Sequence, residues 1–161
     1  MTPREHREFA STTAAAPVGA VWELLAATDR YAEWLESTTE VLRTDGAARV
    51  GATFVERSRI SGFWMATIHW TVTECEPERR LAFEGRGVAV LTDLGFSVDL
   101  VDHGVATEVT LTLWYTPRFG PFGTFLDLVT RANVTNDQKR SVRTLAFLSE
   151  HQDADDLPPA P

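Results

Sequence analysis

The sequence contains one cysteine, Cys75, so no disulfide can form within the chain, and packing and hydrogen bonds must hold the fold. It has no apolar run of about 18 residues, the length that predicts a membrane-spanning helix. Residues 1–8 are polar and lack the apolar stretch of a secretory signal peptide. From these absences we expect a cytoplasmic protein without a membrane span.

The glycine-rich nucleotide-binding motifs and the Gly-x-Ser-x-Gly motif of hydrolases are also missing. The histidines, which supply many metal sites, are widely separated: His6, His69, His103 and His151. We therefore expect neither a metal nor another cofactor. Cys75 is expected to be a structural thiol beside a turn.

Positive charge is scarce. Asp and Glu number 23 against 15 Lys and Arg, a formal net charge of −8. A surface of this sign repels phosphate backbones, so nucleic acid is not an expected partner. The 161 residues, 43% of them hydrophobic, fit a single domain, 1–151. Residues 152–161 are acidic and proline-rich and are expected to form a disordered tail.

Hydrophobic spacing predicts one strand, two short helices, six strands and one long helix. The helices are expected over 17–27 and from a cap at Asp29 to Leu35, after a strand over 7–13. The period then changes to two, which predicts strands over 39–44, 52–60, 63–74, 80–85, 88–101 and 105–117. Residues 121–151 predict the long helix.

These elements predict an α+β fold. Strands joined by tight turns form an antiparallel sheet, and an apolar sheet face must be covered. Only the C-terminal helix is long enough to cover it. We therefore expect a curved sheet of about seven strands wrapped around that helix, enclosing an apolar cavity, with two short helices after the first strand.

Several segments resemble one superfamily. They are residues 16–25, Trp34, residues 50–56, residues 70–81 and the hairpin that ends at Thr107. Over about residues 5–150 the chain resembles the SRPBCC superfamily, the Bet v 1/START-like helix-grip proteins, and within it the bacterial polyketide cyclase/dehydrase type. The resemblance implies a deep apolar pocket between sheet and long helix. It does not set the chemistry, because one fold serves many functions.

Glu56 is the first candidate for catalysis. On the strand 52–60, Phe54 and Ile60 mark the apolar face, and a period of two places Glu56 and Ser58 on it. Burial would raise the pKa of this carboxyl, which suits a general acid or base. The alternatives are a bulge that turns Arg57 and Arg59 inward, or a structural pair with an arginine.

Tyr115 and Asp93 are the other catalytic candidates. Tyr115 shares the inner face of its strand with Leu113, so its hydroxyl could enter the pocket. Asp93 faces solvent if the strand is regular, and faces inward if Gly95 forms a bulge. The polar middle of the long helix is either a solvated face or part of a wet cavity wall. Expected ligand contacts are Trp34, Phe54, Ser58, Trp64, Ile68, Trp70, Phe83, Leu113, Phe125, Val129, Asn133 and Asp137.

Three functions stay open at this stage. The first is cyclisation or dehydration of a polyketide-like, lipid-like or aromatic substrate by acid–base chemistry. The second is a carrier or sensor that binds a lipid, quinone or aromatic metabolite without changing it. The third is a protein-interaction module that uses Phe119, Phe122 and Phe125. The expected partner is a small hydrophobic ligand, and the expected state is a monomer or homodimer.

Overall fold

The computed structural model describes residues 4–61, 64–118 and 120–152, with side chains for all of these except 61 and 120–133. The expected order of elements is confirmed. It runs β1 (His6–Ala14), α1 (Val18–Ala26), the 3-10 turn η1 (Thr28–Arg30), α2 (Tyr31–Trp34), β2 (Thr38–Thr44), β3 (Thr53–Ser61), β4 (Trp64–Glu76), β5 (Arg80–Arg86), β6 (Leu91–Asp102), β7 (Thr107–Pro117) and α3 (Gly120–Glu150).

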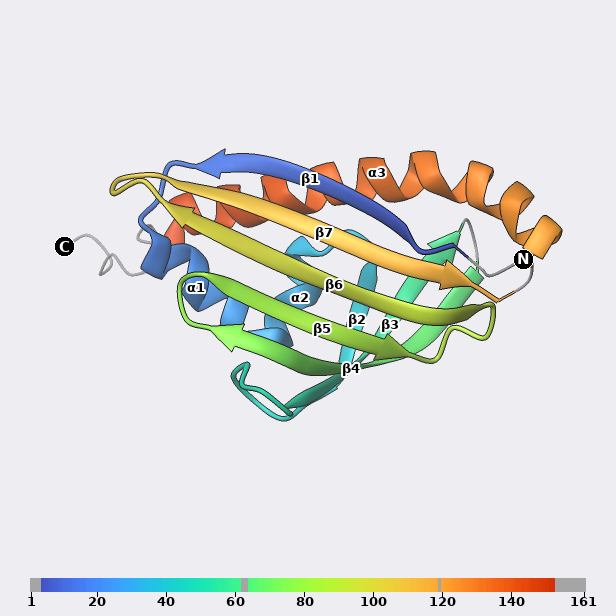
Figure 1. Ribbon diagram of the computed structural model, residues 1–161. Helices are drawn as coiled ribbons and strands as arrows, with labels where there is room; N and C mark the ends of the chain where they lie inside the picture. The colour runs from blue at the N-terminus through green and yellow to red at the C-terminus, as the bar shows by residue number, and fades with distance from the viewer. Residues whose placement is uncertain (1–3, 62–63, 119, 153–161) are drawn as a thin grey trace.

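The strands form one curved antiparallel sheet in the order β1-β7-β6-β5-β4-β3-β2. Each strand pairs with its neighbour in the chain, except that β1 returns to pair with β7. The long helix α3 runs beside β1 and β7 and also contacts α1 and α2 (Figure 1). This is the helix-grip α+β fold that the sequence predicts. Among the described helices, none is long and apolar enough to cross a membrane.

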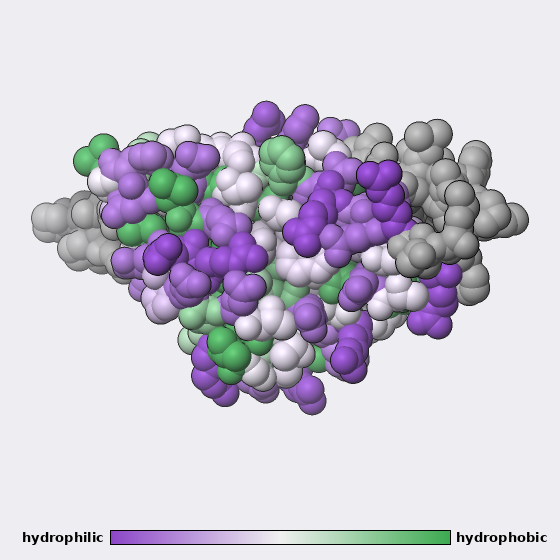
Figure 2. Space-filling view, in the orientation of Figure 1, coloured by the Kyte–Doolittle hydropathy of each residue, from purple (hydrophilic) through white to green (hydrophobic). Residues whose placement is uncertain are grey.

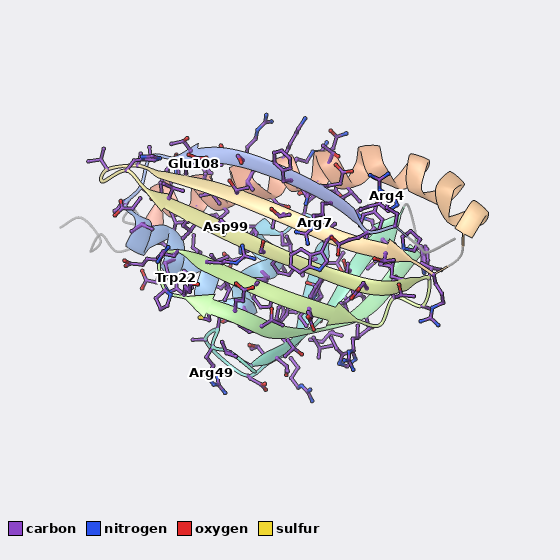
Figure 3. The ribbon with its side chains drawn as sticks, viewed as in Figure 1. Arg4, Arg7, Trp22, Arg49, Asp99 and Glu108 are labelled. Atoms are coloured by element: carbon purple, nitrogen blue, oxygen red, sulfur yellow. The ribbon has the colours of Figure 1, made fainter. Side chains whose placement is uncertain are left out.

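Alternation along the strands separates a core face from a wet face. On β4, Ile68, Trp70 and Val72 are buried, whereas His69 and Thr71 between them are exposed. This is the pattern of a sheet with one face in contact with water. The face seen in Figure 2 is mainly hydrophilic with isolated apolar residues. Charged residues such as Arg7, Asp99 and Glu108 stand on this outer side (Figure 3).

The buried face of α3 is partly polar. Its described buried residues follow helical spacing: Gln138, Ser141, Val142, Leu145, Ala146 and Ser149. The two serines donate hydrogen bonds to carbonyls one turn earlier, Ser141 Oγ to Asp137 O at 2.7 Å and Ser149 Oγ to Leu145 O at 2.7 Å. A hydroxyl that is hydrogen-bonded in this way can be buried at little cost in stability. The buried face of α3 therefore includes polar residues as well as apolar ones.

Some expected details were wrong. Strand β6 begins at Leu91 rather than Val88, because Gly87 (φ 121°) turns the chain and residues 89–90 form a tight turn. The bulge lies between Leu91 and Asp93, not at Gly95. Asp29 lies inside η1 and does not cap α2. Of the predicted disordered tail, 152–161, all but residue 152 falls outside the described residues.

Candidate functional site

The inward direction predicted for Glu56 is confirmed. Its side chain is only 1% exposed and its neighbours in sequence, Arg57 and Arg59, face solvent. Thr38 Oγ1, on the edge strand β2, donates a hydrogen bond of 2.6 Å to Glu56 Oε2. No Lys or Arg among the described residues forms an ion pair with this carboxyl. A buried carboxyl without a cationic partner lowers the stability of a folded protein, and such groups occur mainly at functional sites.

Burial raises the pKa of Glu56 above its ordinary value. The hydrogen bond from Thr38 opposes this shift because it stabilises the carboxylate, and so does the neighbouring indole N–H of Trp70. Trp70 Nε1 does not meet the geometry of a full hydrogen bond. We therefore regard its effect on the carboxylate as a close electrostatic approach. The carboxyl is moved toward the neutral range, where acid–base chemistry is most effective.

Aromatic rings form the wall beside Glu56. Tyr31 is fully buried and contacts the rings of Trp34, Phe54, Phe83 and Phe96 at centroid distances of 4.9, 5.1, 5.9 and 6.4 Å. Its hydroxyl donates to Leu25 O at 2.6 Å. The pKa of Tyr31 is raised well above its ordinary value, first by burial and then by the charge of Glu56. The phenol therefore stays protonated and serves as structure.

Three buried polar atoms have no hydrogen-bond partner among the described residues: Trp34 Nε1, Trp70 Nε1 and Gln138 Oε1. Each belongs to a side chain at most 5% exposed. Buried polar groups almost always have a partner, so unpartnered ones require an explanation. A bound molecule with a carbonyl or hydroxyl group could supply it.

The structure gathers one group of the predicted ligand contacts around Glu56. Phe54 and Ser58 flank it on β3, Ile68 and Trp70 face it from β4, and Phe83 follows on β5. Ser58 Oγ donates to Ser37 O at 3.2 Å. Trp34 joins the same wall through Tyr31, whereas Trp64, at the start of β4, and Leu113, on β7, are half-buried.

The other predicted catalytic residues lie elsewhere. Tyr115 is buried and stacks on His6 at 5.4 Å, but β6, β5 and β4 separate its strand from β3. Asp93 is exposed, because β6 pairs regularly from Asp93 onward, with no bulge at Gly95, and alternation from the buried Phe96 places its side chain on the outer face. The side-chain hydrogen bond to Glu56 comes from Thr38 rather than from either of these residues, and their cooperation with Glu56 stays a prediction.

Predicted contacts on α3 are only partly described. Phe125, Val129 and Asn133, like the proposed aromatic patch of Phe119, Phe122 and Phe125, lie outside the described side chains. Asp137 is half-buried, and its pKa is raised by burial and by Glu36, while Arg59 and Arg140 oppose that shift. It belongs to a group of charged residues formed by the segment after α2, β3 and α3.

Sequence reasoning missed three residues of this region: Thr38, Tyr31 and Gln138. Thr38 lies on an irregular edge strand, where bulges prevent the sequence from giving the pairing. The sequence places Tyr31 in a short helix without indicating its contacts, and it places Gln138 in the polar middle of the long helix, which is either a solvated face or part of a wet cavity wall. Gln138 lies seven residues, about two helical turns, before the apolar Leu145, and this spacing is the sequence signal that places both on one face of the helix. No group of His, Cys, Asp and Glu suited to a metal ion occurs among the described residues.

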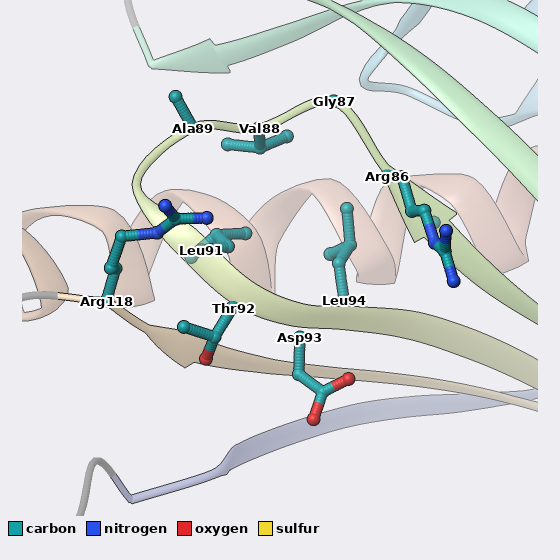
Figure 4. A pocket seen from close by; sticks show the side chains of 10 residues that line it. Arg86, Gly87, Val88, Ala89, Leu91, Thr92, Asp93, Leu94 and Arg118 are labelled. Atoms are coloured by element: carbon teal, nitrogen blue, oxygen red, sulfur yellow. The ribbon is translucent and has the colours of Figure 1, made fainter.

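A second feature of the molecule is a pocket at the C-terminal end of β5. A partly open pocket of about 550 Å³ opens beneath the loop between β5 and β6 (Figure 4). We call it the loop pocket; its lining includes Gly85, Arg86, Val88, Leu91, Leu94 and Arg118. Leu91 and Leu94 pack against the buried core. The pocket therefore has an apolar inner wall and charged groups at its rim.

One family model, described as polyketide cyclase/dehydrase and lipid transport, matches residues 7–150. A comparison with curated proteins found no significant match. Among solved structures, the Zhui aromatase/cyclase of a Streptomyces species is 17% identical with a TM-score of 0.79, and the match covers 93% of this chain and 96% of that one. Two more of the similar solved structures illustrate the range of proteins with this fold.

The first is the two-domain ARO/CYC protein StfQ from the steffimycin biosynthetic pathway, 12% identical with a TM-score of 0.74; the match covers 93% of this chain and 52% of StfQ. The second is Ara h 8.0201, 6% identical with a TM-score of 0.66, covering 91% and 98% of the two chains. At these identities the likeness shows the shared fold.

Proposed function

Because this chain belongs to the polyketide cyclase/dehydrase and lipid transport family, we propose that it binds a small hydrophobic molecule between its sheet and α3 and changes it by acid–base chemistry at Glu56. One observation carries the proposal. Glu56 is a buried carboxyl with no cationic partner among the described residues, held by Thr38 and surrounded by aromatic rings. A purely structural core would gain stability from an apolar residue at this position.

The chemistry we propose is an intramolecular aldol closure followed by loss of water. The Glu56 carboxylate takes a proton from a carbon next to a substrate carbonyl. The resulting carbanion forms a bond with a second carbonyl carbon of the same molecule, whose oxygen then takes that proton. In the dehydration, Glu56 removes a further proton from the carbon next to the carbonyl. The new hydroxyl group then leaves as water, because Glu56 returns this proton to it. No oxidant, reductant or metal is required, and each proton that Glu56 accepts it returns.

The surrounding residues support this use. The indole N–H of Trp34 lacks a protein partner among the described residues and can donate to a substrate oxygen, whereas that of Trp70 lies beside the Glu56 carboxyl. The aromatic wall offers flat apolar area to a ring or a folded chain. Holding the two reacting carbons together supplies much of the rate in such closures. The alternative, a carrier that anchors its ligand on Glu56 without turnover, uses the same residues.

The test compares Glu56→Gln with Glu84→Gln, a matched loss of one carboxylate on the exposed face of β5. A synthetic linear β-polyketone thioester is the substrate, and mass spectrometry detects loss of water. We expect Glu56→Gln to reduce turnover by about 10²–10⁴-fold, the usual contribution of general acid–base catalysis. Its affinity for the thioester should stay within a few-fold.

Three outcomes separate the alternatives. Turnover unchanged in Glu56→Gln removes this residue from the mechanism. Binding without turnover in the unsubstituted protein favours a carrier. Absence of both binding and turnover for this and other apolar ligands contradicts the proposed function as a whole.

A further inference from the structure

The loop pocket and the Glu56 region meet at a single side chain, Trp70. Gly85 lines the loop pocket and pairs with Trp70 across β4 and β5. A Cβ at Gly85 would lie 2.6 Å from Trp70 Cζ3 and 2.8 Å from Cε3, so the benzene edge of the indole covers this glycine. The opposite edge of the same indole carries the N–H that acts on Glu56. One ring therefore separates the pocket from the carboxyl.

The chemistry of the loop pocket differs from that of the core. Its inner wall is apolar, with Val88 only 6% exposed and Leu91 and Leu94 half-buried. Its rim carries two exposed arginines, Arg86 and Arg118, and neither forms an ion pair with a described residue. Its volume of about 550 Å³ lies within the usual range for small-molecule sites.

Arg118 is the better placed of the two. Its backbone N–H donates to Val90 O at 2.8 Å, which ties the end of β7 to the loop. Figure 4 shows its side chain reaching from β7 toward the loop, whereas those of Arg86 and Asp93 point the other way. Asp93 is the one carboxylate among the described lining residues. The guanidinium is therefore available to an anion that enters the pocket.

We propose that the loop pocket is the outer end of the ligand site and that Arg118 binds the anionic end group, a carboxylate or phosphate, of an otherwise apolar ligand. A guanidinium is always charged and matches either group with two parallel hydrogen bonds. The apolar part then runs past Leu91 and Leu94 toward Trp70. On a chain of net charge −8, a local cation offsets the repulsion that an anionic ligand otherwise meets.

This inference rests on the proposed function, because it specifies the ligand of that site. Three ten-carbon probes that differ only in their end group test it: decanoic acid, decyl phosphate and 1-decanol. Titration calorimetry at neutral pH, below the concentration at which the probes form micelles, gives their affinities. We expect the unsubstituted protein to bind an anionic probe about 10-fold more tightly than 1-decanol, the effect of one charged hydrogen-bonded contact.

The variants are Arg118→Ala, Arg118→Lys and Arg143→Ala, the last removing an exposed cation of α3 as a charge control. Arg118→Ala should bind all probes about as weakly as 1-decanol. Arg118→Lys should keep part of the preference, and Arg143→Ala all of it. Tighter binding of decanoic acid identifies a carboxylate as the end group, and tighter binding of decyl phosphate identifies a phosphate.

Several results would overturn the inference. One is an anion preference that survives in Arg118→Ala or is also lost in Arg143→Ala. Another is equal loss of 1-decanol binding in Arg118→Ala, since Arg118 would then support the fold. Equal binding of all probes by the unsubstituted protein refutes the anion site and leaves the proposed function standing. Binding of none of them also refutes the anion site, and the thioester assay then decides the proposed function separately.

Discussion

Thr38 Oγ1 lies 2.6 Å from Glu56 Oε2 and donates the one side-chain hydrogen bond found for this carboxyl in the described part of the chain. The two residues come from adjacent strands, β2 and β3, and both side chains are buried, at 4% and 1% exposure. The contact stabilises the ionised form of Glu56 against the desolvation that raises its pKa. The protonation state of the site therefore depends on a residue of an edge strand.

Replacement of Thr38 by valine removes this hydrogen bond with little change in shape. We expect the pKa of Glu56 to rise further, and stability at neutral pH to fall by about 1.5–3 kcal/mol, the usual worth of a hydrogen bond to a charged group. Infrared difference spectra of the carboxylic acid and urea unfolding measure the two effects. Thr39→Val, an exposed neighbour, is the control. An unshifted Glu56 titration in Thr38→Val would show that the contact is weak in solution.

Glu56→Gln should stabilise the protein in a pH-dependent way. The pKa of Glu56 in the folded protein is raised above its ordinary value of 4.5, so the unfolded chain releases this proton first as pH rises. The burial penalty is absent below the unfolded pKa. It grows between the unfolded and folded pKa values and is complete above the folded one. The stability gained in Glu56→Gln should grow over that same window.

Urea unfolding of Glu56→Gln and of the exposed control Glu84→Gln across pH measures this gain. The control should show no such growth. A gain for Glu56→Gln that is independent of pH would show that the carboxyl is not strained by burial.

Two glycines allow a matched test of how closely indole rings pack on the sheet. A Cβ at Gly85 would meet the buried Trp70 at 2.6 Å, and one at Gly95 would meet the half-buried Trp114 at 2.3 Å. The inner ring is enclosed by core side chains, whereas the outer ring can swing into solvent. We expect Gly85→Ala to cost about 1–3 kcal/mol, the range for overpacked cores, and Gly95→Ala less, despite its shorter distance.

Urea unfolding and near-ultraviolet circular dichroism of both alanine variants check this order. Equal costs would mean that Trp114 is held as tightly as Trp70, for instance by the Arg7 guanidinium 5.4 Å from its ring centroid.

Tyr31→Phe isolates the hydroxyl at the centre of the aromatic wall. The ring contacts remain, but Leu25 O loses a buried donor at 2.6 Å. We expect a loss of about 1–2 kcal/mol in the free energy of unfolding. Decanoic acid binding should be unchanged, because the phenol serves structure. A large loss of decanoic acid binding without loss of stability would instead show that the Tyr31 hydroxyl contacts the ligand.

Much of the candidate site could be predicted from the sequence, because the alternation of side chains along a strand is a local property. Phe54, Glu56 and Ser58 had to share one face, and Phe54 showed which face it was. The same reasoning placed Trp70 and Ile68 beside them once β3 and β4 were adjacent. The long helix and the meander followed from hydrophobic periods alone, without any knowledge of contacts.

What the sequence could not supply depends on contacts between distant segments. The Thr38–Glu56 bond requires the register of β2 on β3, which contains two irregularities. The exposure of Asp93 depends on the absence of a bulge at Gly95, which only the pairing of β6 with β7 decides. The buried polar face of α3 depends on hydroxyls that bond to carbonyls of their own helix. The covering of Gly85 by Trp70 and the position of Arg118 at the loop pocket arise only when the sheet curves.

The composition and periodicity of the chain thus determined a curved sheet, a covering helix and an inward-facing Glu56. Tertiary structure alone decided which groups surround that carboxyl and where an anionic end group could bind. The physical reason is that a side chain's direction follows from its own strand, whereas its pKa and its partners follow from neighbours that only the assembled sheet provides.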